Sequence, residues 1–228
     1  SDDKAPAIAL AAALDALAAA RAEPSVNLKV FFEGEEEAGS PHLRRVLERN
    51  KELLKADLWL LCDGPVHQSR RPQVYFGARG VTAVEITLFG PSRTLHSGHY
   101  GNWAPNPAVL AAQLVASMRD AEGRILIAGY SDDVRPIGEA ERRALASVPD
   151  NDAELGKELR RGAREAGGAR LAERILLPAL NVRGLESGHV GERAANAIAT
   201  EARISIDFRL VPNQTLDGVR AKVERHIR

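Results

Sequence analysis

Cysteine is nearly absent from this sequence, because Cys62 is the only one among 228 residues. A lone cysteine excludes a framework of intrachain disulfide bonds, and the simplest interpretation is a reducing compartment, so we expect a cytoplasmic protein. An excess of either charge is also missing, since 31 Lys and Arg residues balance 31 Asp and Glu residues. This balance gives no support for nucleic acid or a membrane surface as a partner.

Long hydrophobic runs are absent as well. A membrane-spanning helix needs about 20 predominantly apolar residues, and the nearest candidate, residues 7–22, is interrupted by Asp15 and Arg21. What the sequence does contain is ordinary for a globular protein, with 44% hydrophobic and 27% charged residues. The length is sufficient for one large domain or two modest ones.

The first part of the chain alternates expected helices with short apolar runs. Residues 6–22 are rich in Ala and Leu, and residues 41–55 follow Ser40, a suitable cap, with Pro41 at the first helical position. Residues 27–32 and 56–65 favour short strands. This order of elements is typical of a parallel α/β sheet, in which functional groups gather beyond the carboxyl ends of the strands.

The second part has a different pattern, and we place the boundary between residues 79 and 80. Residues 201–212 alternate apolar and polar side chains, which predicts a half-buried strand. The pattern is typical of an α+β domain with a mostly antiparallel sheet. Further expected elements are β-rich segments at 73–80 and 81–90, helices at 106–120, within 136–177 and after Thr215, and a short strand at 124–130.

The acidic residues of the first part are unusually crowded. Four of the five positions from 33 to 37 are glutamates, and Asp63 ends the second apolar run. Like charges repel, and burying them costs several kcal/mol unless they are paired. One interpretation is a solvated loop, and the other is a site for divalent cations, which carboxylates bind well. Each position taken alone favours solvation, whereas the placement of two acidic groups at strand ends favours a metal site.

Several motifs, taken together, resemble a known family. They are "SDDKAP", "EGEEEAGS", "LCDGP", "RG", "TLHSGHYGN" and "FRLVPN", in this order and at fitting distances over essentially the whole chain. The sequence resembles the co-catalytic zinc metallopeptidase family of aminoacylases, carnosinase-type dipeptidases and glutamate carboxypeptidase, and is most similar to the dipeptidase branch. The resemblance implies a partial phosphorylase/hydrolase-like, parallel-sheet catalytic domain over residues 1–79. An α+β lid, or dimerisation, domain with an antiparallel sheet would follow over residues 80–228.

The resemblance implies a centre of two divalent metal ions, zinc in the first place and manganese as the alternative. Asp2 matches the carboxylate that bridges both ions, while Glu37 and Asp63 match terminal ligands of one ion each. Glu36 matches the general acid/base. A general base of this kind takes a proton from the metal-bound water and passes it to the leaving amine.

The resemblance also implies two functional residues in the lid domain. His96 matches a histidine that reaches the active site of the partner subunit in a homodimer, where it polarises the scissile carbonyl group. Arg209 matches an arginine that holds the free carboxylate of the substrate. A loop histidine without a catalytic role and a solvated arginine are the alternative interpretations of these two residues.

The implied activity is hydrolysis of the amide bond of dipeptides by a metal-activated water. The alternatives are deacylation of N-acyl amino acids and a non-catalytic remnant that only dimerises. The family also uses two histidine ligands, and none of the six histidines here precedes an aspartate by two positions, as one of those ligands should. We therefore expect this chain to be a fragment of a longer protein and to be inactive by itself.

Overall fold

The structure is a computed structural model that describes residues 4–64, 67, 69–71, 73–75 and 77–228. The chain divides into two compact units, residues 1–66 and 67–228. The predicted domain boundary after residue 79 stays a prediction. Within the described ranges, no helix is both long enough and apolar enough to cross a membrane.

The first unit contains short helices joined by irregular segments. They are α1 (Lys4–Ala19), a 3-10 turn (Glu36–Ala38), α2 (Leu43–Arg49) and α3 (Lys51–Leu54). The single helix expected over residues 41–55 is divided at Asn50. Its side-chain Nδ2 donates to the carbonyl oxygen of Val46 at 2.8 Å, where the helical backbone bond of Asn50 also ends. This side-chain bond competes with the next helical turn, so α2 stops there.

The two strands expected in the first unit do not form among its described residues. Apolar side chains in both segments are exposed, for example Phe32 at 69% and Leu60 at 71%. The first segment is bonded to the end of α3, because Lys29 Nζ donates to the carbonyl oxygens of Leu53 at 2.8 Å and Lys55 at 2.7 Å. A strand requires a backbone ladder with a neighbour, and the described part of this unit supplies none, so the prediction of these strands was wrong.

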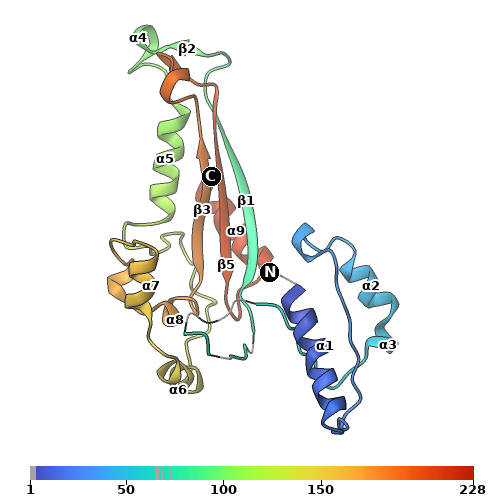
Figure 1. The fold of residues 1–228 in the computed structure, drawn as a ribbon. Coiled ribbons are helices and arrows are strands. Elements are labelled where there is room, and N and C mark those ends of the chain that lie inside the picture. Colours follow the sequence, from blue (N-terminus) through green and yellow to red (C-terminus); the bar gives the residue numbers. More distant parts are fainter. Residues whose placement is uncertain (1–3, 65–66, 68, 72, 76) are drawn as a thin grey trace. The chain divides into compact units, whose positions relative to one another are not determined.

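The second unit is built on a three-stranded antiparallel sheet (Figure 1). The central strand β5 (Glu201–Leu210) pairs with β1 (Gly80–Phe89) on one side and β3 (Ala179–Glu186) on the other. The ladder with β1 is continuous from Gly80 opposite Leu210 to Phe89 opposite Glu201. The mixed α/β class and the antiparallel sheet of the lid are confirmed.

The alternation predicted in β5 creates the core of this unit. Ile204, Ile206 and Phe208 are fully buried, and α5 (Pro107–Met118) and α9 (Leu216–Ile227) contribute the facing side chains. Both helices begin as their caps predict, because Asn106 Oδ1 accepts from the Ala108 amide at 3.0 Å and Thr215 Oγ1 from the Gly218 amide at 3.1 Å. Other core residues are Ala111, Met118, Ile127, Tyr130, Leu180, Ala202, Leu210, Val219 and Val223.

The remaining elements lie at the two ends of the long strands (Figure 1). One end carries a small sheet of β2 (Leu95–His96) and β4 (Ala197–Ile198). Helix α4 (Ser97–Tyr100) comes directly after β2. Toward the other end lies an excursion between α5 and β3 that contains α6 (Glu139–Ser147), α7 (Asp152–Glu158), a 3-10 turn (Ala166–Gly168) and α8 (Leu171–Arg174). A further 3-10 turn spans Gly191–Arg193. The prediction of a strand at 124–130 was wrong, because the only β pairing of that segment among the described residues is an isolated bridge between Ile125 and Arg119.

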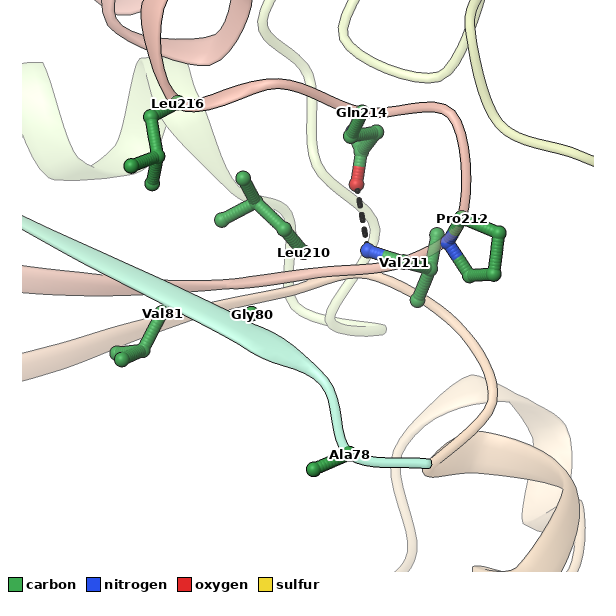
Figure 2. A pocket seen from close by; sticks show the side chains of 8 residues that line it. All are labelled: Ala78, Gly80, Val81, Leu210, Val211, Pro212, Gln214 and Leu216. Carbon is green, nitrogen blue, oxygen red and sulfur yellow. Dashed lines mark hydrogen bonds between the residues drawn. The ribbon is translucent and has the colours of Figure 1, made fainter. Parts of the chain in front are cut away.

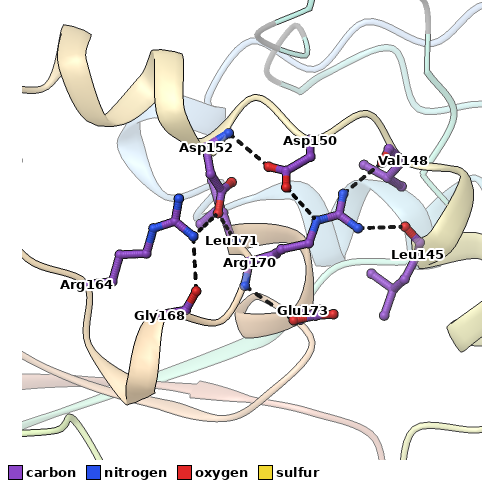
Figure 3. Close-up of polar contacts among 9 residues, drawn as sticks. All are labelled: Leu145, Val148, Asp150, Asp152, Arg164, Gly168, Arg170, Leu171 and Glu173. Carbon is purple, nitrogen blue, oxygen red and sulfur yellow. Dashed lines mark hydrogen bonds and ion pairs between the residues drawn. The ribbon is translucent and has the colours of Figure 1, made fainter.

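Arg170 holds the excursion together from within (Figure 3). Its guanidinium donates to the carbonyl oxygens of Leu145 at 3.3 Å and Val148 at 2.8 Å, and its Nε lies 3.6 Å from a carboxylate oxygen of Asp150. One side chain therefore fixes the end of α6 and the following loop against the start of α8.

An apolar pocket of about 440 Å³ lies where β1 begins and β5 ends (Figure 2). Gln214 gives it a polar corner, because its Oε1 accepts from the Val211 amide at 3.2 Å while its Nε2 donates to the Tyr130 carbonyl at 3.0 Å. None of its described lining residues is titratable, so we do not place reaction chemistry here. The lining residues are Ala78, Gly80, Val81, Leu210, Val211, Pro212, Gln214 and Leu216.

Candidate active site

The glutamate run of the first unit is folded partly by its own carboxylates. Glu33 accepts hydrogen bonds from the backbone amide of Glu35 at 2.8 Å and from the hydroxyl of Ser40 at 3.3 Å. Gly39 closes the turn with φ +82°, a conformation that glycine adopts without strain. The carboxylate of Glu33 is therefore used to shape the loop.

Glu35 is also engaged within the loop. Both of its carboxylate oxygens lie 3.0 Å from Nδ1 of His42, which precedes α2. The backbone carbonyl of Glu35 accepts from the amides of Ala38 and Ser40, both at 2.9 Å. Glu33 and Glu35 thus make contacts within the loop, and Glu36 and Glu37 lie in an exposed 3-10 turn.

The predicted metal ligands are only partly described. Glu37 and Asp63 are both exposed carboxylates of the first unit, and among the described residues neither makes a hydrogen bond or ion pair. Asp2 lies outside the described residues. The described part of the chain contains no group of three or more His, Cys, Asp or Glu side chains able to hold a metal ion. Glu37 and Asp63 have the oxygen donors that divalent ions accept, but the predicted set of three stays a prediction.

His96 is positioned in the second unit by the small sheet and by its own ring. It pairs with Ala197 between β2 and β4, and its Nδ1 accepts a hydrogen bond from the Gly98 amide at 3.1 Å. An accepting Nδ1 carries no proton, so the neutral ring has its proton on Nε2. The close approach favours glycine, because a Cβ on Gly98 would lie 3.0 Å from Cε1 and 3.2 Å from Nδ1 of His96, so the ring would have to shift. The exposed ring therefore presents an Nε2–H donor.

A series of aromatic rings continues from His96. Its ring centroid lies 4.7 Å from that of His99, and Tyr100 follows at 6.4 Å from His99. Trp103 ends the series, 6.1 Å from Tyr100, with 79% of its surface exposed. The series therefore ends in a large exposed apolar side chain.

Arg209 lies at the other end of β5 and is held by Asp207. Its Nε donates to Oδ2 of Asp207 at 3.2 Å, and Oδ1 of the same carboxylate accepts from Asn181 Nδ2 on β3 at 2.9 Å. The Asp207 side chain is only 10% exposed, whereas that of Arg209 is 47% exposed. Asp207 therefore orients a guanidinium that remains accessible to an anion.

Arg79, just before β1, belongs to the same group of charges. Burial lowers the pKa of its guanidinium first, the nearby Arg209 cation lowers it further, and Asp207 acts in the opposite direction. Asp207 thus offsets part of the repulsion between these two arginines. Sequence reasoning did not single out Asp207 or Asn181, and it noted Arg79 only within the short motif "RG", without assigning it a role. The alternation of β5 placed Asp207 on the polar face, but nothing local indicated that it would be buried.

His96 and Arg209 are brought into the same unit but not together. His96 adjoins the end of the sheet at which Glu201 begins β5, and Arg209 follows Glu201 by eight positions along that strand (Figure 1). Strands rise about 3.3 Å per residue, so roughly 26 Å separates these two positions. An extended dipeptide is about 7 Å long. The two side chains of one chain therefore cannot contact the same dipeptide.

Comparison with known proteins identifies the second unit. Residues 76–228 match the sequence profile described as a peptidase dimerisation domain. The Cys-Gly metallodipeptidase of Schizosaccharomyces pombe is 29% identical over 100% of this chain and 48% of its own length. The human Beta-Ala-His dipeptidase is 28% identical over 100% of this chain and 46% of its own. The chain spans about half the length of the curated relatives it matches.

Solved structures give the same grouping. An M20 family metallo-carboxypeptidase from Sulfolobus solfataricus superposes with a TM-score of 0.74 and 33% identity, over 86% of this chain and 45% of its own. Human carnosine dipeptidase 1 superposes with a TM-score of 0.71 and 25% identity, over 99% of this chain and 49% of its own. The similarity thus extends across both units of the chain.

Proposed function

The chain belongs to the M20 peptidase dimerisation domain family, and from this premise we propose that it forms part of a metal-dependent hydrolase that cleaves dipeptides. The observation that carries the proposal is that metallodipeptidases from a yeast and from humans align with the whole chain, including the part before residue 76. A domain that served dimerisation alone would need to match only over the second unit.

The catalytic centre of the proposal lies in the first unit. Asp2, Glu37 and Asp63 would hold two divalent ions, zinc in the first place and manganese as the alternative. Such ions, when bound, lower the pKa of a coordinated water to near neutrality. Glu36 would accept the proton of that water and return it to the leaving amine. The exposure of Glu37 and Asp63, and the internal use of Glu33 and Glu35, support this division of roles.

The second unit would supply the groups that hold the substrate. Arg209 presents a planar fork suited to a substrate carboxylate, and the Nε2–H of His96 is suited to donate to the oxygen of the scissile carbonyl. The separation along β5 supports a homodimer, because His96 of one copy and Arg209 of another can meet the same dipeptide. The exposed Trp103 beside His96 supports a contact surface there.

Partners and compartment complete the proposal. The substrate would be a dipeptide, or an N-acyl amino acid in the alternative, because both leave one free carboxylate for Arg209. We place the protein in the cytoplasm on the strength of its single cysteine. The balanced charge makes neither nucleic acid nor a membrane surface a partner in this proposal.

The test uses the complete gene product that contains residues 1–228. Hydrolysis is measured against a panel of dipeptides and N-acetyl amino acids, after dialysis against a chelator and again after adding zinc or manganese. We expect metal-dependent hydrolysis of dipeptides. Faster turnover of N-acetyl amino acids would replace the substrate assignment. A folded protein that binds no divalent ion would favour the non-catalytic alternative and overturn the proposal.

Arg209→Gln and Arg203→Gln give a matched comparison in the same assay. Both residues lie on β5 and face the same side of the strand. Arg203 is exposed, and its Nη2 lies 2.7 Å from Oε1 of Glu201. We expect Arg209→Gln to raise KM by at least about tenfold, since an ionic hydrogen bond contributes about 1.5–3 kcal/mol. Arg203→Gln should leave KM unchanged. Equal effects of both variants would contradict the role of Arg209.

A further inference from the structure

A second cavity of the lid, separate from the apolar pocket, has a strongly basic lining. It measures about 350 Å³, within the range of sites for small molecules. Three arginines and one glutamate are its charged residues, and the edge strand β3 forms one wall. The residues that line it are Arg79, Arg119, Gly123, Glu165, Arg174, Ile175, Pro178, Ala179, Leu180 and Asn181.

The three arginines are incompletely neutralised. Arg119 pairs with Glu165, with 2.5 Å between Nη2 and Oε2. Arg79 donates to the carbonyl oxygen of Leu177 at 3.3 Å. A carbonyl group has no net charge, so this bond does not neutralise the guanidinium. Arg174 is partly buried, and it makes no ion pair with any residue in the described ranges. A concave site with one carboxylate for three guanidinium groups attracts an anion.

The electrostatics of Arg79 agree with this excess. Burial and the neighbouring Arg209 both lower the pKa of Arg79, and the Asp207 carboxylate offsets only part of that effect. An anion bound near Arg79 would relieve the repulsion between the two cations.

The backbone keeps the cavity open at Gly123. This residue has φ +79° and closes a turn in which its amide donates to the Asp120 carbonyl at 3.1 Å. The carboxylate of Asp120 also accepts from the Arg124 amide at 2.8 Å, which fixes the turn. A Cβ on Gly123 would overlap Oε2 of Glu165 and lie 3.0 Å from Nη2 of Arg119. Glycine at this turn therefore leaves the space in which Arg119 and Glu165 pair beside the cavity.

We propose that this cavity binds a small anionic ligand, either a carboxylate or a phosphate compound, through Arg174, Arg79 and Arg119. Arginine suits such groups, because its planar guanidinium donates two parallel hydrogen bonds to one oxyanion. Glu165 occupies one of the three guanidinium groups and competes with the ligand for it. The inference does not depend on peptidase activity, because it uses only residues of the second unit.

The test measures binding to the chain of residues 1–228 by isothermal titration calorimetry. Citrate and inorganic phosphate are the probes, and chloride at matched ionic strength is the monovalent comparison. We expect saturable binding of at least one probe and none of chloride. Citrate alone would identify a carboxylate ligand, and phosphate alone would identify a phosphorylated one. The absence of saturable binding by both probes would overturn the proposal.

Three variants locate the site. Arg174→Gln should weaken binding on the order of tenfold, because it removes an ionic hydrogen bond without leaving a carboxylate unpaired. Glu165→Gln should tighten binding several-fold by freeing Arg119, a gain that a misfolded protein would not show. Arg143→Gln, on the exposed face of α6 and paired with Glu139 at 3.0 Å, should change nothing. If Arg174→Gln matches Arg143→Gln, or if Glu165→Gln weakens binding, the assignment is wrong.

Discussion

Asp207 and Arg209 lie on the same face of the central strand, with Nε of the arginine 3.2 Å from Oδ2 of the aspartate. The aspartate is the more deeply buried partner, and it also accepts from Asn181 on the neighbouring strand. This pair joins strand pairing to the orientation of the Arg209 guanidinium, because the same carboxylate contacts both β3 and Arg209.

Replacing Asp207 by asparagine should destabilise the second unit by about 2 kcal/mol, because a buried charge pair loses one partner and Arg79 and Arg209 are left to repel each other. Urea unfolding followed by circular dichroism measures the change. The matched control is Asp132→Asn, an exposed residue, which should alter the free energy of unfolding by less than about 0.5 kcal/mol. A loss no larger than that of the control would show that Asp207 does not stabilise the sheet.

Replacing Gly98 by alanine should displace the His96 ring, because the added Cβ would lie 3.0–3.2 Å from two ring atoms. Two-dimensional NMR of the imidazole nitrogens distinguishes the tautomers. The unsubstituted chain should show the proton on Nε2, and Gly98→Ala should show a mixture. Gly101 is unsuitable as a control, since its Cβ would approach the Ser97 carbonyl, so Gly162→Ala serves instead, because a Cβ on this exposed glycine would meet nothing within 4 Å. An unchanged tautomer in Gly98→Ala would argue against the contact.

Lowering the pH should remove the stabilising contribution of Glu141. The hydrogen bond from Arg135 lowers the pKa of Glu141, so its contribution is complete above the unfolded-state pKa of about 4.3. It disappears as the pH falls through the lower folded-state pKa. The difference in unfolding free energy between the unsubstituted chain and Glu141→Gln should therefore shrink between about pH 6 and pH 3.

Glu139→Gln on the same helix is the control for the Glu141 experiment, since it also removes one acidic group from α6. Both variants are followed by urea unfolding at several pH values. The same pH trend in the two variants would mean that the Arg135 contact is not its cause.

Substituting Trp103 by serine should weaken self-association at least about tenfold, because a tryptophan at the centre of an interface commonly contributes 2 kcal/mol or more. Sedimentation velocity over a range of concentrations gives the dimer dissociation constant. Trp59→Ser makes the same chemical change in the first unit, where the side chain is 49% exposed, and should have no effect on association. If Trp59→Ser alone dissociates the dimer, the contact surface lies elsewhere.

The chain of residues 1–228 should hydrolyse no dipeptide at a detectable rate, even with zinc added. The family resemblance calls for two histidine ligands besides Asp2, Glu37 and Asp63, and none of the six histidines fits the upstream motif. A colorimetric assay of released amine measures the rate. Robust turnover by this chain would show that three carboxylates are sufficient.

The second unit was largely predictable because its signals are local. Alternation placed Ile204, Ile206 and Phe208 in the core, and the Asn106 and Thr215 caps marked where two helices begin. β3 escaped prediction, since its register shifts between Val182 and Gly184 and interrupts any alternation. A bulge depends on the partner strand, which a sequence pattern does not reveal.

The first unit was less predictable for a related reason. Its apolar runs have strand-like composition, but a strand exists only where a neighbour completes the ladder, and within the described residues no neighbour does. For the candidate site, the sequence identified His96 and Arg209 as individual residues. It could not indicate the length of strand between them, nor the burial of Asp207, because both arise from the packing of segments far apart in the chain.

The single-residue hub at Arg170 affects where the excursion tolerates change. Because this guanidinium satisfies carbonyl groups within its own excursion, residues 145–170 are held together partly by their own contacts, whereas Ile127 and Tyr130 of the same excursion pack in the core of the sheet. Changes in length or sequence between residues 145 and 170 should therefore disturb the sheet less than changes near Tyr130.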